Sequence, residues 1–289
     1  MNHHQHAYDG HRHDAADVDF GAIADLLDLD AEVLHTYLSD ATGWVHDQAA
    51  GLTVARLIDL GCGTGPAAVE LAGRWPAAEV VAVDGSAALL ARLRAKAARL
   101  GLADRVHTVE ADLDGPWPDT GAVDLVWTSM TLHHLADPGQ ALREIFARIR
   151  PGGLLAVAEL TSSLRFLPDD IGIGRPGLEA RCNAVFDETH AAALPHLDAD
   201  WGAFMSQAGF ADVVKRSFEI DVTAPLPAAA GRFAQWSLQR GREQFDGRLD
   251  AADLATLDAI TSDDGPHSVL RRPDLVIRGA RTLWTGRRP

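Results

Sequence analysis

Three glycines at alternate positions follow a short apolar segment of the chain. Gly61, Gly63 and Gly65 come directly after residues 54–60, and Asp59 precedes the first glycine by two positions. Glycine lets the backbone approach a ligand closely and adopt a positive φ without steric cost. Such a loop beyond the end of a strand predicts a binding site for a nucleoside-bearing cofactor. Because a carboxylate repels a pyrophosphate at short range but attracts an ammonium or a sulfonium, the spacing favours a cationic ligand.

Two other kinds of glycine-rich loop bind phosphates, and both fit this segment less well. A dinucleotide loop reads G-x-G-x-x-G/A, and here Gly61 and Gly63 fit while Pro66 stands at the last position. A mononucleotide loop ends in Lys followed by Ser or Thr, which this segment does not contain. An NAD-dependent oxidoreductase stays open as the alternative enzyme class.

Strand patterns and helical patterns alternate along much of the chain. The segments that indicate strands are 54–60, 79–84, 105–112, 122–129, 152–160, 212–222 and 274–288. Helical patterns separate most of the first five, and those strands are nearly continuously apolar. This order predicts a parallel sheet with helices on both faces. Two further helices are expected within residues 18–48, with Asp30 as the N-cap of the second.

Five segments resemble, in order, the motifs of the class I S-adenosylmethionine-dependent methyltransferases that act on small molecules. They are DLGCGTG (59–65), VVAVDGS (80–86), EADLDGPWP (110–118), DLVWTSMTLHHLADP (124–138) and IRPGGLLAVAEL (149–160). The resemblance implies a Rossmann-like, doubly wound α/β fold with a seven-stranded sheet whose last strand is antiparallel. It also implies S-adenosyl-L-methionine as the cofactor.

We expect four parts along the chain. Residues 51–160 form the cofactor-binding core, and residues 16–50 form a helical cap. Residues 161–289 complete the sheet and carry helical insertions that form a lid over the acceptor site. Residues 1–15 contain five histidines and few apolar side chains, which predicts a mobile polar tail rather than a metal-binding tract.

The resemblance also implies particular cofactor contacts. Asp84 ends the second strand, where its two carboxylate oxygens would accept both ribose hydroxyls. Asp112 would accept a hydrogen bond from the exocyclic amine of the adenine, and the Leu113 backbone would lie beside the adenine ring. The alternative is that Asp112 is only a loop acid or the N-cap of a helix. Asp59 would orient the glycine loop and face the methionine ammonium. The remaining expected contacts are Gly61, Cys62, Gly63, Gly65, Gly85, Ser86, Thr128 and Ser129.

Three side chains are candidates for acid–base chemistry at the ends of neighbouring strands. His133 and His134 follow the fourth strand, and Glu159 nearly ends the fifth. Since adjacent side chains point in different directions, one histidine is expected to be a buried structural group, and we favour His134 as the base. His190 and His196 are second candidates. Methyl transfer from a sulfonium needs alignment and exclusion of water but no metal ion.

The acceptor site is expected between the cap and the insertions. Aromatic residues in these segments are Tyr37, Trp44, Phe166, Phe186, Phe204, Trp236 and Phe245. An apolar pocket built from them would accept an aromatic or polyketide-like small molecule. We favour methylation of oxygen, with carbon and nitrogen open, and a non-catalytic cofactor-binding protein is a further alternative.

The amino-acid composition limits which binding partners and which cellular compartment are expected for this protein. The formal net charge of −15 disfavours binding to nucleic acid or to anionic membranes. The two cysteines, Cys62 and Cys182, are too few for a disulfide scaffold or a four-thiolate zinc site. With no apolar leader or stretch of membrane-spanning length, a cytoplasmic protein is expected. The N-terminal helices could pair two chains in a homodimer.

Overall fold

A seven-stranded sheet forms the centre of the protein. The computed structural model describes residues 20–160, 162–222 and 224–289, so the histidine-rich segment 1–15 lies outside the described residues. The strands are β1 (Arg56–Leu60), β2 (Glu79–Asp84), β3 (Val106–Glu110), β4 (Val123–Ser129), β5 (Ile149–Leu160), β6 (Ala211–Val222) and β7 (Ile277–Arg287). Their spatial order is β3-β2-β1-β4-β5-β7-β6, with β1 to β5 parallel and β7 antiparallel to both neighbours. The predicted Rossmann-like, doubly wound fold is confirmed.

Each face of the sheet packs into its own apolar core. In β2, Val80 and Ala82 belong to one core, and Val81 and Val83 belong to the other. The first core is covered by α2 (His35–Gln48), α3 (Pro66–Arg74) and α4 (Ala87–Arg99), and the second by α5 (Pro138–Arg148) and α7 (Trp201–Gln207). Because apolar side chains leave both faces of the parallel strands, burial on both sides explains why the strand segments read as continuous apolar runs.

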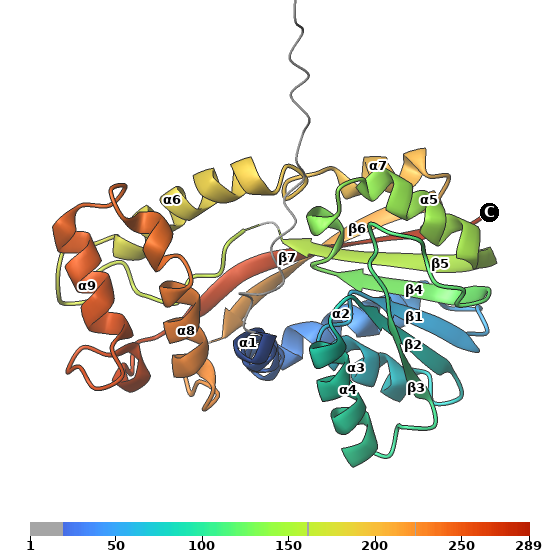
Figure 1. Ribbon diagram of the computed structural model, residues 1–289, viewed down its shortest axis with the longest axis horizontal. Helices are drawn as coiled ribbons and strands as arrows, with labels where there is room; N and C mark the ends of the chain where they lie inside the picture. The colour runs from blue at the N-terminus through green and yellow to red at the C-terminus, as the bar shows by residue number, and fades with distance from the viewer. Residues whose placement is uncertain (1–19, 161, 223) are drawn as a thin grey trace, which may run out of the picture.

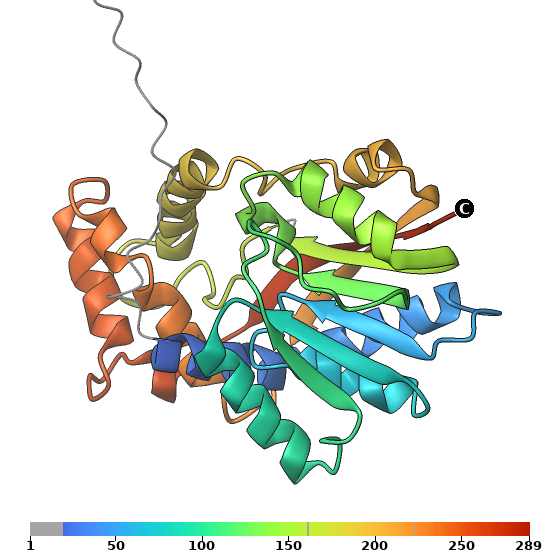
Figure 2. The same cartoon turned by 45° about the vertical axis from the view of Figure 1, so that its right-hand side comes forward.

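The remaining helices form a lobe beside the sheet. The lobe consists of α6 (Leu178–Ala193), α8 (Ala230–Gln239) and α9 (Ala251–Thr261), and α1 (Phe20–Val33) packs against α8. Both views show it beyond the carboxyl ends of the parallel strands, with the long β7 running between lobe and sheet (Figures 1 and 2). The carboxyl ends of β1 and β4, where the strand order reverses, therefore face the lobe.

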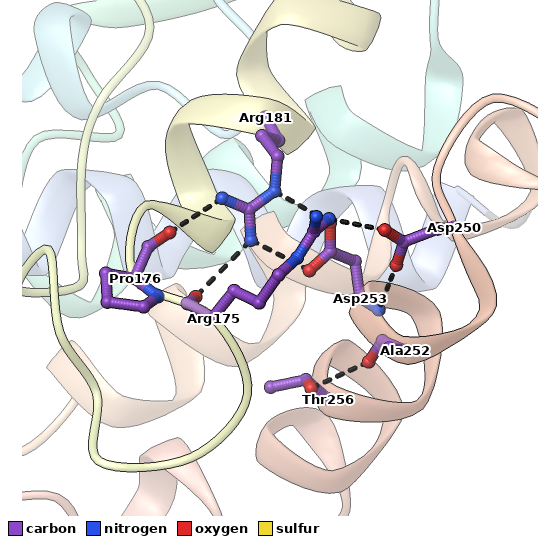
Figure 3. A network of polar contacts seen from close by, with 7 residues as sticks. All are labelled: Arg175, Pro176, Arg181, Asp250, Ala252, Asp253 and Thr256. Carbon is purple, nitrogen blue, oxygen red and sulfur yellow. Dashed lines mark hydrogen bonds and ion pairs between the residues drawn. The ribbon is translucent and has the colours of Figure 1, made fainter.

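A buried carboxylate joins α9 to α6 inside the lobe (Figure 3). Asp253 accepts hydrogen bonds from Arg175 Nη2 at 2.6 Å and from Arg181 Nε and Nη2 at 2.7 and 2.8 Å. Asp250 also pairs with Arg175 and caps α9 by accepting from the Asp253 amide at 2.8 Å. These contacts hold the segment before α6 against a helix that lies more than seventy residues further along the chain.

The N-terminal helices differ from their predicted boundary. α1 continues to Val33 and α2 begins at His35, so Asp30 lies inside α1 instead of capping the second helix. Its carboxylate accepts a hydrogen bond at 2.9 Å from the buried Arg281 of β7. The need to pair a buried guanidinium explains where this aspartate lies. Within the described ranges, every helix is too short or too polar to cross a bilayer.

Candidate active site

A cavity of about 760 Å³ lies between the strand ends and the lobe. Its walls come from the loops after β1, β2 and β4, from the end of β5, and from α1, α2, α6 and α8. A space of this size is typical of small-molecule sites. The cavity therefore joins the glycine loop and the strand-end histidines to the lobe in one continuous space.

The glycine loop adopts a conformation that larger residues would not tolerate. Gly61 and Gly65 have φ values of +70° and +78°. A Cβ at Gly61 would lie 2.0 Å from Thr131 Oγ1, and one at Gly65 would lie 2.1 Å from Leu93 Cδ1. Both glycines are thus required by the turn and by close packing, and of the two only Gly61 lines the cavity.

Asp84 connects the first two strand ends. Its Oδ2 accepts a hydrogen bond from the Gly63 amide at 2.8 Å, and its Oδ1 accepts one from the Ser86 amide at 2.9 Å. Ser86 in turn caps α4 by accepting the Leu89 amide at 3.3 Å. Since each carboxylate oxygen has two acceptor positions, each keeps one for a ligand. Asp84 lines the cavity, whereas its neighbours Gly85 and Ser86 do not.

Asp59 presents a buried carboxylate to the cavity. It is 1% exposed, and its Oδ2 has no hydrogen-bond partner among the described residues. Burial, with a smaller contribution from Asp84, raises the pKa of Asp59 to about 7. The Ala68 amide hydrogen-bonds to this carboxylate, but a buried oxygen without a partner is costly, and Oδ2 fits the ammonium of a bound S-adenosylmethionine. Burial also raises the pKa of the neighbouring Cys62 thiol far above its usual range, so Cys62 stays protonated.

Of the expected cofactor residues after β3 and β4, Ser129 alone is among the residues that line the cavity. Asp112 is exposed and accepts the Asp114 amide at 3.0 Å, and neither it nor Leu113 lines the cavity. Thr128 is fully buried and its hydroxyl has no partner in the described chain, while Ser129 lines the cavity. The fold brings all four to the same edge of the sheet, but only Ser129 reaches the cavity wall.

The strand-end acid pairs with His133. His133 Nδ1 lies 2.5 Å from Glu159 Oε2, and Glu159 Oε1 accepts the Leu132 amide at 3.1 Å. Both side chains of the pair are almost completely buried. His133 belongs to the short 3₁₀ turn η1 (Leu132–His134), and its ring points toward Glu159 of β5.

The pairing with Glu159 distinguishes His133 from His134, while the choice of His134 as the base stays a prediction that the structure does not test. His134 is exposed and its ring centroid lies 4.0 Å from that of His133, although both rings line the cavity. A 3₁₀ turn rotates successive side chains by about a third of a circle, so only one of the two histidines reaches Glu159. Of the two other base candidates, the side chain of His190 lies outside the described residues. The ring centroid of His196 lies 6.2 Å from that of Phe204.

The predicted aromatic residues divide into two groups. Those that line the cavity are Tyr37, Phe166, Phe186 and Phe245. Trp44, Phe204 and Trp236 are not among the cavity-lining residues. Burial raises the pKa of Tyr37 to about 12, so its phenol stays protonated.

Three cavity residues were missed in the sequence. The Thr131 hydroxyl lies between the ends of β4 and β1, within hydrogen-bond distance of the Ser129 carbonyl at 2.9 Å and of the Leu60 carbonyl, directly before the glycine loop, at 3.3 Å. Arg281 and Arg240 both line the cavity. No local signal in the sequence separates Arg281 from the other arginines of 274–288. Arg240 likewise looks like an ordinary surface residue of an amphipathic helix.

Comparisons with known proteins agree with this geometry. A methyltransferase-domain family profile matches residues 57–153. The trans-aconitate 2-methyltransferase of Methylobacterium radiotolerans is 30% identical over 210 residues, which cover 71% of this chain and 75% of that protein. The 27-O-demethylrifamycin SV methyltransferase of Amycolatopsis mediterranei is 34% identical over 157 residues, covering 48% of this chain and 56% of that protein. The chain matches only 24% and 38% of the length of two other curated relatives.

Solved structures share the fold at low identity. The YcgJ protein of Bacillus subtilis has a TM-score of 0.50 at 17% identity, over 86% of this chain and 99% of that chain. The phosphoethanolamine N-methyltransferase 2 of Haemonchus contortus, in complex with S-adenosyl-L-methionine, has a TM-score of 0.50 at 16% identity, over 86% and 52%. With the five motifs in order and the relative that matches over most of both chains, this chain belongs to the class I S-adenosylmethionine-dependent methyltransferases.

Proposed function

We propose that the protein transfers a methyl group to a hydroxyl oxygen of a small organic molecule, with His133 as the general base. The observation that carries this proposal is the buried contact of 2.5 Å between His133 Nδ1 and Glu159 Oε2 at the cavity wall. A buried ionisable pair costs desolvation free energy. A pair retained at the edge of a ligand cavity is therefore a candidate for chemistry.

The contact assigns a role to each nitrogen of the ring. Glu159 accepts a hydrogen bond from Nδ1–H, which leaves the lone pair on Nε2 free to take a proton from the acceptor. Glu159 also stabilises the imidazolium that forms, as the acid of a hydrolase triad does. Its second oxygen is held by the Leu132 amide, so the carboxylate is fixed as well.

The cofactor side of the cavity has residues suited to each part of S-adenosylmethionine. Asp84 would hold the ribose, and the unpartnered oxygen of Asp59 would hold the methionine ammonium. When bound, the cofactor supplies an activated methyl group on its sulfonium. The protein's own work is to align the acceptor, exclude water and accept one proton.

The cavity and the relatives support a small acceptor. About 760 Å³ must contain both the cofactor and the acceptor, which leaves room for a small molecule but not for a folded macromolecule. The relatives are named for trans-aconitate, demethylmenaquinone and a demethylrifamycin. A hydroxyl is favoured because it is neutral near pH 7 and benefits from a base, whereas a carboxylate is already ionised.

The position of the transferred methyl group tests the proposal. The protein is incubated with S-adenosylmethionine carrying a ¹³C-labelled methyl group and with a panel of phenols and aliphatic alcohols, and the products are analysed by NMR. We expect the label on oxygen. Label found on nitrogen or carbon would show that the acceptor class is wrong while the fold and the cofactor stand.

Substituting each histidine in turn tests the assignment of the base. His133→Ala should lower kcat by about 100- to 10,000-fold, the usual contribution of a positioned base, with the affinity for S-adenosylhomocysteine unchanged. Glu159→Gln should lower kcat less and shift its pH profile. His134→Ala is the matched control, and kcat should stay within a few-fold of the wild type. A larger loss for His134→Ala than for His133→Ala would reverse the assignment.

A further inference from the structure

Arg240 lies at the end of α8 with its guanidinium in the cavity wall. Its Cζ is 4.6 Å from the centroid of the Phe186 ring and 6.0 Å from that of Trp236. Contacts of this kind fix the orientation of a guanidinium without neutralising it. The residue retains accessible surface, and it is one of the residues that line the cavity.

In the part of the chain that the structure describes, no carboxylate lies within ion-pair distance of Arg240. Two other arginines do have carboxylate partners. Arg232 on α8 forms an ion pair with Asp263 at 3.1 Å, and Arg281, which also lines the cavity, forms one with Asp30 at 2.9 Å. The surrounding protein lowers the pKa of the Arg240 guanidinium by desolvation alone. Arginine nevertheless stays protonated at neutral pH, so the charge of Arg240 has no ion-pair partner among the described residues.

An arginine in a ligand cavity that has no carboxylate partner can form charge-assisted hydrogen bonds with a bound anion. We propose that Arg240 binds a carboxylate of the acceptor, at the lobe end of the cavity. This inference rests on the proposed methyl transfer to a small molecule. The acceptor is then a hydroxy acid whose hydroxyl faces His133 and whose carboxylate faces α8.

The charges around Arg240 favour a carboxylate over a phosphate. Asp187 and Asp198 also line the cavity, and they would repel a doubly charged anion more strongly than a singly charged one. A single guanidinium matches a single negative charge, whereas a phosphate dianion normally needs several donors or cations. Phe166, Phe233 and Phe245 line the space between the strand ends and α8, so the body of the acceptor should be apolar or aromatic.

Matched pairs of ligands test this proposal through binding as well as turnover. The probes are ω-hydroxy fatty acids and 4-hydroxyphenylalkanoic acids of graded length, each with its neutral primary amide and its phosphate analogue. Calorimetry on the protein saturated with S-adenosylhomocysteine gives the affinities. At least one acid should bind about 10- to 100-fold more tightly than its amide, the range for a hydrogen-bonded charged group.

Variants on one helix identify the residue responsible. Arg240→Met keeps the apolar stem and should bring the acid-to-amide affinity ratio close to one, and Arg240→Lys should restore part of it. Arg232→Met on the same helix is the control and should leave the ratio at the wild-type value. Unchanged affinity for S-adenosylhomocysteine and an unchanged melting temperature would show that the Arg240 variants are folded.

Three results would overturn the inference: no acid binds more tightly than its amide, the ratio survives in Arg240→Met, or the phosphate analogues bind most tightly. Failure of this inference is separable from failure of the proposed function. If neutral amides are methylated as well as acids and His133 is still required, only the role of Arg240 is lost. If acids bind through Arg240 but receive no methyl group on oxygen, the proposed reaction is lost and the anion site stands.

Discussion

Glu159 uses both carboxylate oxygens, one on the His133 ring and one on the Leu132 amide. A carboxylate held at two points holds the imidazole in one orientation and one tautomer. The neighbouring His134 shares the backbone turn but not this support. At the scale of single residues, we therefore propose His133 as the base because Glu159 contacts its ring.

Asp59 should make cofactor binding depend on pH. With a pKa of about 7 in the ligand-free protein, the carboxyl is protonated below that pH and must ionise to hold an ammonium. Binding then releases a proton, so affinity for S-adenosylhomocysteine should fall by up to about tenfold for each pH unit below 7 and level off above it. Calorimetry between pH 5.5 and 8 measures this slope, and Asp59→Asn should flatten it. A slope that is unchanged in the variant would assign the proton to another group.

The same group has an opposite effect on the ligand-free fold. Its folded pKa lies above the ordinary 3.8, so the protein loses stability relative to the unfolded chain as pH rises from about 4 to 7. Asp59→Asn removes this loss and should raise the melting temperature of the ligand-free protein at pH 8 more than at pH 5. An equal melting-temperature change at both pH values would contradict the buried, unpartnered state of the carboxylate.

Asp84 should contribute to affinity rather than to turnover. Its oxygens already organise the glycine loop through the Gly63 and Ser86 amides, and they keep acceptor positions for the ribose. Asp84→Asn should weaken binding of S-adenosylhomocysteine by about 10- to 100-fold, the range for hydrogen bonds to a charged group. Asp104→Asn, an exposed change on the same half of the sheet, should have no effect. Wild-type affinity in Asp84→Asn would remove the ribose role.

At the scale of elements, the lobe depends on contacts between distant segments. Asp253 has a pKa of about 2 because Arg181 and Arg175 stabilise its ionised form, against the cost of burial. That stabilisation is present above the ordinary pKa of 3.8 and is lost as pH falls towards 2. The network in Figure 3 thus holds α6 and α9 together across the neutral range.

Asp253→Asn should destabilise the protein by about 1–3 kcal/mol at pH 7, because two arginines lose a charged partner. Urea unfolding measures the change, and the difference from the wild type should shrink as pH falls below 4. The control is Asp258→Asn on the same helix, whose carboxylate pairs with Arg242 at the surface; it should cost less than about 1 kcal/mol. Equal effects of the two variants would mean that the buried network adds no particular stability.

The sheet could be predicted from the sequence because the inner parallel strands are buried on both faces, as in β2, where successive side chains enter different cores. The position of the lobe could not, because it is set by pairs such as Arg175 with Asp253, which no local pattern connects. The same limit explains Asp30: as a sequence signal it resembles a helix cap, but a buried arginine on β7 determines its partner. His133 and His134 are indistinguishable until the 3₁₀ turn is placed against β5.

At the scale of the whole molecule, one cavity connects the strand ends to the lobe. The cofactor residues Asp59 and Asp84 lie at one end, the His133 pair lies in the wall, and Arg240 belongs to the lobe. On the proposed function, the strand ends would hold the cofactor and the helices of the lobe would select the acceptor.

A crystal structure of the complex with S-adenosylhomocysteine tests this account most directly. We expect the ribose hydroxyls within hydrogen-bond distance of the Asp84 carboxylate, the ammonium beside Asp59 Oδ2, and the sulfur atom in the same cavity as the His133 ring. Adenosine bound away from the ends of β1, β2 and β3, or a sulfur atom separated from His133 by protein, would contradict it.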